Sequence, residues 1–377
     1  MKNDNRNDRR TSGPAKGTGK TKATGKANAA RKTKVTAGKE NRVPVGQGRE
    51  KTTVKNKSGI CPVADKCGGC SWINQPYAEQ LKKKEKQLRE LLAPFCKIEG
   101  VIPMEHPEHY RNKVHAVFGE NRYHDAISGI YEQKSHRIVP VDSCLIENAK
   151  ADEIIVSIRG LLKSFHIRPY NEDTGYGLLR HVLIRTGHVT GQIMVVLVLA
   201  SPILPSKNNF VKALLKLHPE ITTVVINVNN RNTSMVLGDK EHVIYGKGYI
   251  EDELCGKRFR ISPKSFYQVN PVQTEILYGK ALEYAGLTGK ETVVDAYCGT
   301  GTIGMIASDK AGKVIGVELN ADAVRDARNN AKANQIRNIQ FYQNDAGKFL
   351  VEMAGQGAKV DVVLMDPPRS GSTEEFM

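Results

Sequence analysis

The sequence predicts an α/β fold with a parallel sheet in the C-terminal part of the chain, and three stretches carry this prediction. Residues 293–304 read V-V-D-A-Y-C-G-T-G-T-I-G, a buried strand that runs into a glycine loop and then a helix. Residues 313–319, K-V-I-G-V-E-L, and residues 360–369, V-D-V-V-L-M-D-P-P-R, read as further strands that lead to a carboxylate. Because the carboxyl ends of parallel strands meet at one edge of such a sheet, we expect a ligand site there.

The glycine loop alone does not identify the ligand, because nicotinamide- and flavin-binding proteins share its G-x-G-x-x-G spacing. Asp295 stands at the end of the strand, where a carboxylate would repel a pyrophosphate but attract a sulfonium cofactor with an ammonium group. Glu318 ends the next strand and could accept hydrogen bonds from both hydroxyls of a ribose. The pattern indicates a domain that binds S-adenosylmethionine (SAM). The alternative is a dinucleotide-binding domain or a sheet without a ligand.

The charge of the chain is concentrated at its N-terminus. The 377 residues, enough for two or three domains, carry a net charge of +16. Residues 1–57 hold 17 Lys and Arg against four Asp and Glu, and they contain almost no large apolar side chains. Such a segment cannot bury enough surface to fold alone, so we expect a disordered basic tail. The tail either contacts RNA phosphates without sequence preference or only solubilises the protein.

The cysteines indicate a reducing compartment and a metal site. The chain has seven cysteines and no apolar run long enough for a signal peptide or a membrane helix, so a cytoplasmic protein is expected. Cys61, Cys67 and Cys70 form a C-x5-C-G-G-C pattern, and three thiols so close are metal ligands more often than disulfides. Four thiolates suit zinc or an iron–sulfur cluster, and the loose spacing favours iron–sulfur. The candidates for the fourth ligand are Cys96, Cys144, Cys255 and Cys298, of which Cys144 is the one that nothing else local explains.

The middle of the chain predicts an α+β module with a mostly antiparallel sheet. Its clearest feature is a β-hairpin over residues 180–199 with a turn near Thr190-Gly191. Arg111 and Lys113 lie beside a strand, where they could hold RNA phosphates, but periodicity favours a solvated position. His181 and His188 are expected on a strand surface rather than as ligands. Helices are expected at residues 76–93, 151–166 and 206–217.

Residues 265–273, S-F-Y-Q-V-N-P-V-Q, connect this module to the parallel sheet. Core packing explains Phe266 and Tyr267. It explains Gln268 and Asn270 less well, so we expect this aromatic and amide segment to lie over the ligand edge of the sheet.

Five motifs occur together in residues 59–377: C-x5-C-G-G-C, S-F-Y-Q-V-N-P, D-A-Y-C-G-T-G-T-I-G, G-V-E and D-P-P-R. With this combination, residues 59–377 resemble the RNA 5-methyluridine methyltransferase family. The resemblance is to its iron–sulfur-containing 23S ribosomal RNA uracil-C5 branch. It implies a SAM-dependent methyltransferase with a Rossmann-like sheet that methylates C5 of a uridine in RNA. The rivals are a tRNA uracil-C5 methyltransferase, whose branch generally lacks the four cysteines, and a non-catalytic iron–sulfur RNA-binding protein.

The resemblance also implies roles for individual residues. A 4Fe–4S cluster would be held by Cys61, Cys67, Cys70 and Cys144. SAM would be contacted by Gln268, Tyr297, Glu318 and Asp366, with Asp345 approaching the adenine. The expected partner is RNA, 23S rRNA in particular, with neither DNA nor a membrane, and the protein is expected to be a monomer.

The expected domains are a basic tail over residues 1–57, an iron–sulfur and RNA-binding α+β domain over 58–262, and a SAM-binding domain over 263–377. Many relatives begin with a small β-barrel, where this chain has the tail. The family's catalytic cysteine and base are expected beyond residue 377, so this sequence reads as a truncated enzyme that is inactive alone, with no catalytic residue assigned. Cys298 is expected to pack in the glycine loop rather than act as the nucleophile. Four strands of the parallel sheet are expected near residues 292–295, 313–318, 338–342 and 360–365.

Overall fold

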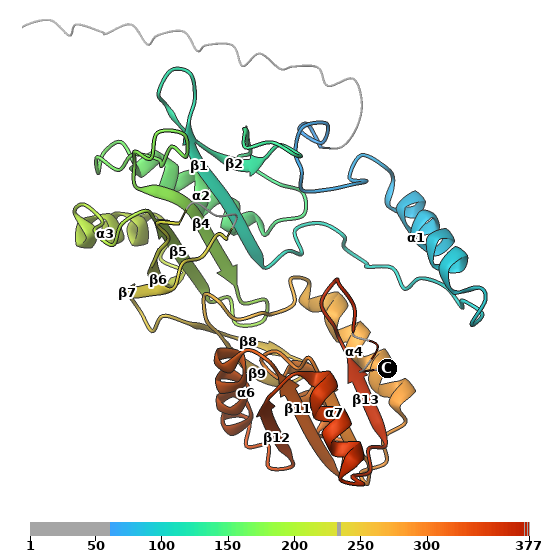
Figure 1. Cartoon of the computed structure of the whole chain (residues 1–377). Coiled ribbons are helices and arrows are strands. Elements are labelled where there is room, and N and C mark those ends of the chain that lie inside the picture. The colour runs from blue at the N-terminus through green and yellow to red at the C-terminus, as the bar shows by residue number, and fades with distance from the viewer. Residues whose placement is uncertain (1–60, 232–234, 373, 375, 377) are drawn as a thin grey trace, which may run out of the picture. The chain divides into compact units, whose positions relative to one another are not determined.

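Two large β-sheets and a hairpin organise the residues that the computed structural model describes, which are 61–231, 235–372, 374 and 376 (Figure 1). They belong to one unit, Asn56–Met377. The predicted disordered tail, residues 1–57, lies outside the described residues. No helix in the described part of the chain is both long and apolar enough to cross a membrane.

The first sheet has seven strands in the order β3-β2-β1-β4-β5-β6-β7. Every neighbouring pair is antiparallel except β5 and β6, so the predicted mostly antiparallel sheet is confirmed. The predicted hairpin is formed by β4 and β5, with Gly191 in the turn at a φ of +66° that favours glycine. The strands are β1 Lys113–Glu120, β2 Ala126–Tyr131, β3 Ile138–Pro140, β4 Leu179–Thr186, β5 Ile193–Leu199, β6 Ile221–Val228 and β7 Lys240–Tyr245.

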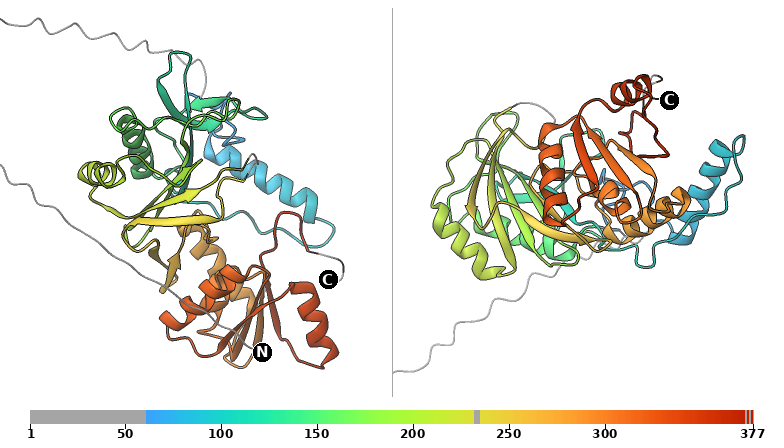
Figure 2. Two further views of the ribbon diagram at one scale, coloured as in Figure 1. Left: turned by 60° about the vertical axis from the view of Figure 1, so that its left-hand side comes forward. Right: turned by 90° about the horizontal axis from the view of Figure 1, so that it is seen from below.

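Two helices cover one face of this sheet, α2 (Ala149–Leu161) and α3 (Lys207–Leu217) (Figure 1 and Figure 2). The side chain of Asn148 accepts hydrogen bonds from two backbone N–H groups of the first turn of α2, which fixes where that helix begins. By contrast, α1 (Tyr77–Leu92) has no buried residue. The apolar side chains of α2, α3 and the strands beneath them form one continuous core.

The opposite face of the seven-stranded sheet shares a core with the rest of the chain. Met194, Val196 and Val198 of β5 pack in the same cluster as Phe259 of the hairpin β8–β9 (Ile250–Leu254 and Lys257–Ile261). This cluster continues into the second sheet through Val293. The two sheets are therefore joined by packed apolar side chains.

The second sheet is parallel, with the order β12-β11-β10-β13, and its strands lie where the sequence predicts them. One face is covered by α7 and the other by α4, α5 and α6. The strands are β10 Thr292–Ala296, β11 Lys313–Glu318, β12 Ile339–Gln343 and β13 Val362–Met365. The helices are α4 Pro271–Ala285, α5 Thr302–Ala307, α6 Ala321–Ala333 and α7 Ala346–Gly355.

Candidate cofactor and RNA site

Carboxylates stand at the carboxyl ends of all four strands of the parallel sheet. Asp295 lies in β10, Glu318 ends β11, Asp345 follows β12, and Asp366 follows β13. The chain runs from β10 outward to β11 and β12 and then returns to β13 on the other side of β10, so the strand order reverses there. Ligands of open α/β sheets bind at such a reversal. The four side chains line one cavity of about 560 Å³, which we call the cofactor cavity.

The glycine loop forms one wall of the cofactor cavity. Gly299 and Gly301 have φ angles of +55° and +81°. A Cβ at Gly301 would lie 2.8 Å from the ring of Phe341, so only glycine fits there. Tyr297 also lines the cavity and has a φ of +64°, which is uncommon for a residue with a side chain and is found at functional sites.

Glu318 is fixed by the backbone on both of its carboxylate oxygens. Oε2 accepts a hydrogen bond from the N–H of Gly299 at 3.0 Å, and Oε1 accepts one from the N–H of Asn320 at 2.8 Å. Each oxygen keeps a further lone pair for a ligand. The side chain is therefore oriented in advance, which lowers the cost of binding a pair of hydroxyl groups.

Asp295 is the most buried of the four carboxylates, with 1% of its surface exposed. Oδ2 accepts a hydrogen bond from the N–H of Gly304 at 2.8 Å, whereas Oδ1 is buried without a partner. Burial raises the pKa of this carboxyl to about 7, and the charges of Asp366 and Glu318 add to the shift. A Cβ at Gly304 would lie 2.7 Å from Oδ2, which explains the last glycine of the loop.

Asp345 has a structural contact as well as a place in the cofactor cavity. Its side chain caps α7 by accepting a hydrogen bond from the N–H of Lys348 at 3.1 Å. Asn344 lines the cavity beside it. The structure therefore places four of the five predicted SAM contacts in one cavity.

Gln268, the fifth residue predicted to contact SAM, lines a neighbouring cavity of about 780 Å³, which we call the larger cavity. Its Nε2 donates a hydrogen bond to Oδ2 of Asp366 at 3.0 Å, so it reaches the edge of the cofactor cavity. Asn112 holds the segment by donating from its side chain to the carbonyl of Gln268 and from its backbone to that of Val269, each at 3.0 Å. The expectation that core packing explains Phe266 is wrong, because its side chain is 65% exposed, whereas Tyr267 is buried. Phe266 lines both cavities, as do Pro367 and Pro368.

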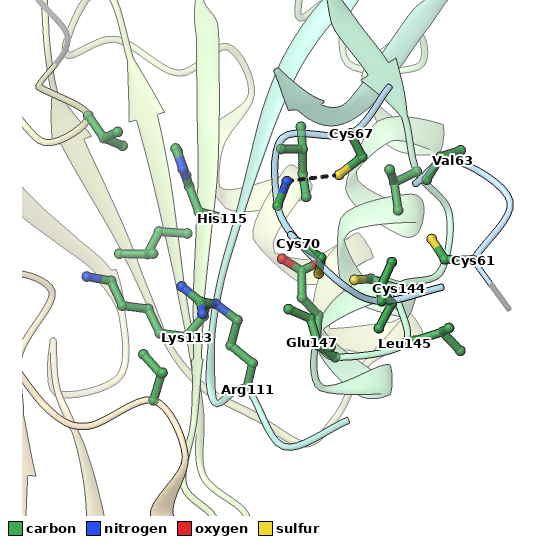
Figure 3. Close-up of a pocket in the computed structure, with 18 of the residues that line it drawn as sticks. Cys61, Val63, Cys67, Cys70, Arg111, Lys113, His115, Cys144, Leu145 and Glu147 are labelled. Carbon is green, nitrogen blue, oxygen red and sulfur yellow. Dashed lines mark hydrogen bonds between the residues drawn. The ribbon is translucent and has the colours of Figure 1, made fainter. Parts of the chain in front are cut away.

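The larger cavity also contains the four predicted thiol ligands. Cys61, Cys67, Cys70 and Cys144 all line it, and Figure 3 shows their sulfur atoms around a common space. All four are free thiols. Burial raises the pKa of Cys144 to about 11, and it also raises the pKa of Cys70, with further contributions from Cys67 and Cys61. Within the described residues, no group of three or more His, Cys, Asp or Glu side chains is arranged to hold a metal ion.

The expectation that Lys113 is solvated is wrong. Lys113 is half-buried in the larger cavity together with Arg111 and Arg369. Burial lowers the pKa of Lys113 to about 8, and the positive charges of Arg185 and Arg111 lower it further. Alternate residues of a strand share a face, so the positions 111, 113 and 115 could have indicated one basic face. Only the fold shows that this face is covered.

The expected surface position of His181 is also wrong. His181 is 6% exposed, and its ring lies 4.9 Å from that of His115 on the neighbouring strand. Burial lowers its pKa to about 3, with contributions from His115 and Arg180, so the imidazole is neutral. It lies on the same face of the sheet as Lys113 and His115, because Val117 of β1 pairs with His181 of β4.

Cys298 is a packed residue of the glycine loop, 5% exposed. A Cβ added at Gly316 would lie 3.1 Å from its sulfur. Burial raises the pKa of the thiol, and the charges of Asp295 and Glu318 raise it further, so the thiolate is disfavoured. This agrees with the packing interpretation of the sequence.

The sequence is similar to those of known methyltransferases. Residues 287–371 match a family model described as a methyltransferase domain. An uncharacterized RNA methyltransferase of Halalkalibacterium halodurans is 42% identical over 322 residues, which cover 84% of this chain and 70% of that protein. One of Caldanaerobacter subterraneus is also 42% identical, with coverages of 84% and 71%. The chain therefore belongs to this family of RNA methyltransferases.

A solved structure agrees with the family. It is the Pyrococcus abyssi tRNA (uracil-54, C5)-methyltransferase in complex with S-adenosyl-L-homocysteine (SAH). The TM-score is 0.69 at 25% sequence identity, and the match covers 82% of this chain and 72% of that one. The likeness extends beyond the methyltransferase domain, because the match covers 82% of this chain whereas the domain model matches residues 287–371 alone.

Proposed function

We propose that this RNA methyltransferase transfers the methyl group of SAM to C5 of a uridine, with 23S rRNA as the favoured substrate. One observation carries the proposal. The cofactor cavity and the larger cavity share a wall, which is formed by Phe266, Pro367 and Pro368. A cofactor in one cavity would therefore face a nucleotide in the other. The complex of the P. abyssi enzyme with SAH supports SAM as the methyl donor.

The cofactor cavity offers groups for each part of SAM. The carboxylate of Glu318 is oriented to accept hydrogen bonds from the two ribose hydroxyls. Asp345 and the neighbouring Asn344 would meet the adenine, whose exocyclic amine is a donor. Tyr297 and Asp366 would flank the methionine part, and Gln268 would hold Asp366 in place through its hydrogen bond.

The larger cavity offers positive charge for RNA. Arg111, Lys113 and Arg369 line it, and Lys and Arg side chains supply most of the affinity of proteins for nucleic-acid phosphates. The exposed ring of Phe266 could stack on an unpaired base, which is the common way to hold a single-stranded RNA base. We propose that the target nucleotide enters here and that the protein works as a cytoplasmic monomer.

Methylation at C5 needs groups that activate uracil. A nucleophile that adds to C6 makes C5 enolate-like, C5 then attacks the methyl group of SAM, and a base removes the C5 proton so that the nucleophile can leave. Cys298 is the thiol that lines the cofactor cavity in the described part of the chain. Since its burial disfavours the thiolate, we assign Cys298 to packing and not to this step.

We further propose that Cys61, Cys67, Cys70 and Cys144 hold a 4Fe–4S cluster. The residue types support this proposal, because four free thiols line one cavity and four thiolates suit such a cluster. When bound, the cluster would supply metal–thiolate bonds that tie the loop of residues 61–70 to the segment around Cys144.

The proposed activity is tested with the product of the complete reading frame. RNA from a strain that lacks the gene is incubated with the protein and with SAM, and its nucleosides are identified by mass spectrometry. We expect new 5-methyluridine in 23S rRNA, and a covalent adduct with RNA that contains 5-fluorouridine, because fluorine cannot leave as a proton does. New 5-methylcytidine instead of 5-methyluridine would contradict the proposal.

tRNA is the second candidate substrate, because the structurally similar P. abyssi enzyme acts on tRNA. The same experiment separates the two, since 23S rRNA and tRNA are purified and digested separately. New 5-methyluridine in tRNA alone would retain the uracil-C5 activity and replace the substrate.

A further inference from the structure

The helix α1 leaves most of its surface uncovered. None of its 16 residues is buried, and Figure 1 and Figure 2 show it to one side of both large sheets. The helices of a globular protein normally bury one face, and this burial supplies most of their stability. A helix without such a face has a surface that is free to contact a partner.

A cavity of about 650 Å³ lies along α1, and we call it the helix cavity. Its described lining has three aromatic side chains, which are Trp72, Tyr77 and Tyr110. The lining also has two cations, Lys84 and Arg111, against the single carboxylate of Glu108. Bases of single-stranded RNA stack on aromatic rings, and their phosphates bind Lys and Arg, so this composition is typical of a surface that binds an RNA strand.

Hydrogen bonds hold the walls of the helix cavity together. The hydroxyl of Tyr77 accepts one from the N–H of Met104 at 2.8 Å, which ties α1 to the segment of residues 101–111. Nε2 of Gln273 donates one to the carbonyl of Ile102 at 3.2 Å, which ties the same segment to α4. The cavity is therefore a defined part of the fold, with α1 as one of its walls.

The helix cavity adjoins the larger cavity. The two share lining residues, among them Cys70, Arg111 and Leu145. Arg111 is held at this boundary, because its Nε donates a hydrogen bond to the carbonyl of Lys113 at 3.2 Å. An RNA strand whose target nucleotide lies in the larger cavity would therefore reach the helix cavity past this guanidinium.

The cations of α1 are not equivalent. Three of them form ion pairs with glutamates of the same helix, at 2.9, 3.7 and 2.6 Å, and these are Lys82, Lys86 and Arg89. Lys83 and Lys84 are exposed, and neither pairs with a carboxylate among the described residues. Lys84 lines the helix cavity, and Nζ of Lys83 lies 6.0 Å from the ring centre of Trp72. The uncompensated positive charge of α1 therefore lies beside the aromatic rings.

We propose that α1 and the helix cavity bind the single-stranded RNA segment next to the target nucleotide. The inference rests on the proposed function, because it concerns a further part of the same substrate. Bases of this segment would stack on Trp72 and on the neighbouring tyrosines, while Lys83 and Lys84 would contact its phosphates. The second contact lengthens the stretch of RNA that the protein holds, so it favours substrates in which the target uridine lies within an unpaired strand.

Fluorescence anisotropy with labelled oligouridine tests this surface on the complete protein. A trinucleotide is compared with a strand of about ten nucleotides, and we expect the wild type to bind the longer strand more tightly. The double substitution Lys83→Gln and Lys84→Gln should reduce this preference about tenfold. It should also lower the slope of log affinity against log salt by about 1.4 for the longer strand, because each phosphate contact of a single strand contributes about 0.7. The matched control, Lys82→Gln with Lys86→Gln, removes the same charge outside the cavity and should retain the preference.

Crosslinking gives a second readout that needs no variant. Oligouridine that carries one 4-thiouridine is irradiated together with the wild type, and the crosslinked peptides are identified by mass spectrometry. We expect crosslinks to the peptides that contain Trp72 or Tyr77. Trp72→Leu should lose the first of these crosslinks and weaken binding of the longer strand about tenfold, because a stacking ring is removed.

Three results would overturn the inference and leave the proposed function intact. The first is that the wild type crosslinks only to other peptides. The second is that the substitutions of Lys83 and Lys84 weaken binding of both strands equally, which would mean a merely structural role. The third is a lower melting temperature with an unchanged length preference, which would mean that α1 packs against another part of the protein. If the wild type binds neither strand, the proposed RNA site in the larger cavity falls together with this inference.

Discussion

At the scale of single residues, Glu318 should account for much of the affinity for SAM. Its two oxygens are already oriented by Gly299 and Asn320, and charge-assisted hydrogen bonds contribute about 1.5–3 kcal/mol each. We expect Glu318→Ala to weaken SAM binding by about tenfold or more, measured by calorimetry. Glu352→Ala removes an exposed carboxylate outside the cavity and should have no effect. Unchanged affinity in Glu318→Ala would exclude the ribose contact.

Lys113 gives a second prediction at this scale. Because its pKa is about 8, it should be charged at pH 7 and largely neutral at pH 9, where other lysines remain charged. RNA binding should therefore weaken between these pH values in the wild type and less so in Lys113→Met. Lys163→Met, which removes an exposed charge outside the cavity, is the control. Parallel pH profiles for the wild type and Lys113→Met would show that Lys113 does not contact RNA.

These residues also show what the sequence could predict. Asp295, Glu318 and Asp366 were identifiable because each stands where a strongly apolar strand ends, and strand ends of parallel sheets meet. The burial of Lys113 and His181 could not be predicted, because alternation along a strand indicates which residues share a face but not what covers that face. Around Lys113 the covering comes from the cysteine loop and the D-P-P-R segment, which are far away in the sequence. His181 instead lines a cavity with residues from 117–138 and 168–180.

At the scale of elements, the glycine loop offers a comparison within one turn. Gly299 and Gly301 both have positive φ angles, but a Cβ at Gly299 meets no atom within 4 Å, whereas one at Gly301 meets Phe341. Gly299→Ala should cost only the backbone strain, about 1–2 kcal/mol. Gly301→Ala should lower the melting temperature further and abolish SAM binding. Equal melting temperatures for the two variants would show that the loop has room to move.

The bounds of the four strands of the parallel sheet were predicted to within two residues. The order of these strands in the sheet was not predicted. Runs of β-branched residues that end at turn signals locate a strand by local sequence alone. The order β12-β11-β10-β13 depends on which helices pack on which face, and that is decided by contacts between distant residues.

At the scale of the whole molecule, the larger cavity joins three parts of the chain that are distant in sequence. They are the loop of residues 61–70, the segment around Cys144, and the start of β1. Protein purified without oxygen should contain about four iron atoms per chain. Cys144→Ala should lose this iron and lower the melting temperature, whereas Cys96→Ala, at an exposed cysteine, should change neither. Stoichiometric zinc in place of iron would contradict the assignment, and retained iron in Cys144→Ala would place the fourth ligand elsewhere.

The hydrogen bond between Gln268 and Asp366 crosses the wall between the two cavities, and it has a thermodynamic consequence. A ligand in either cavity that orders this pair makes the other cavity ready for its own ligand. Binding would then be cooperative, and because linkage is reciprocal, the factor by which SAM tightens RNA binding equals the factor by which RNA tightens SAM binding. The contacts of Asn112 with the carbonyls of Gln268 and Val269 connect this segment to the start of β1. Because free energy is a state function, the order in which the two ligands arrive should not alter the affinity of the final complex.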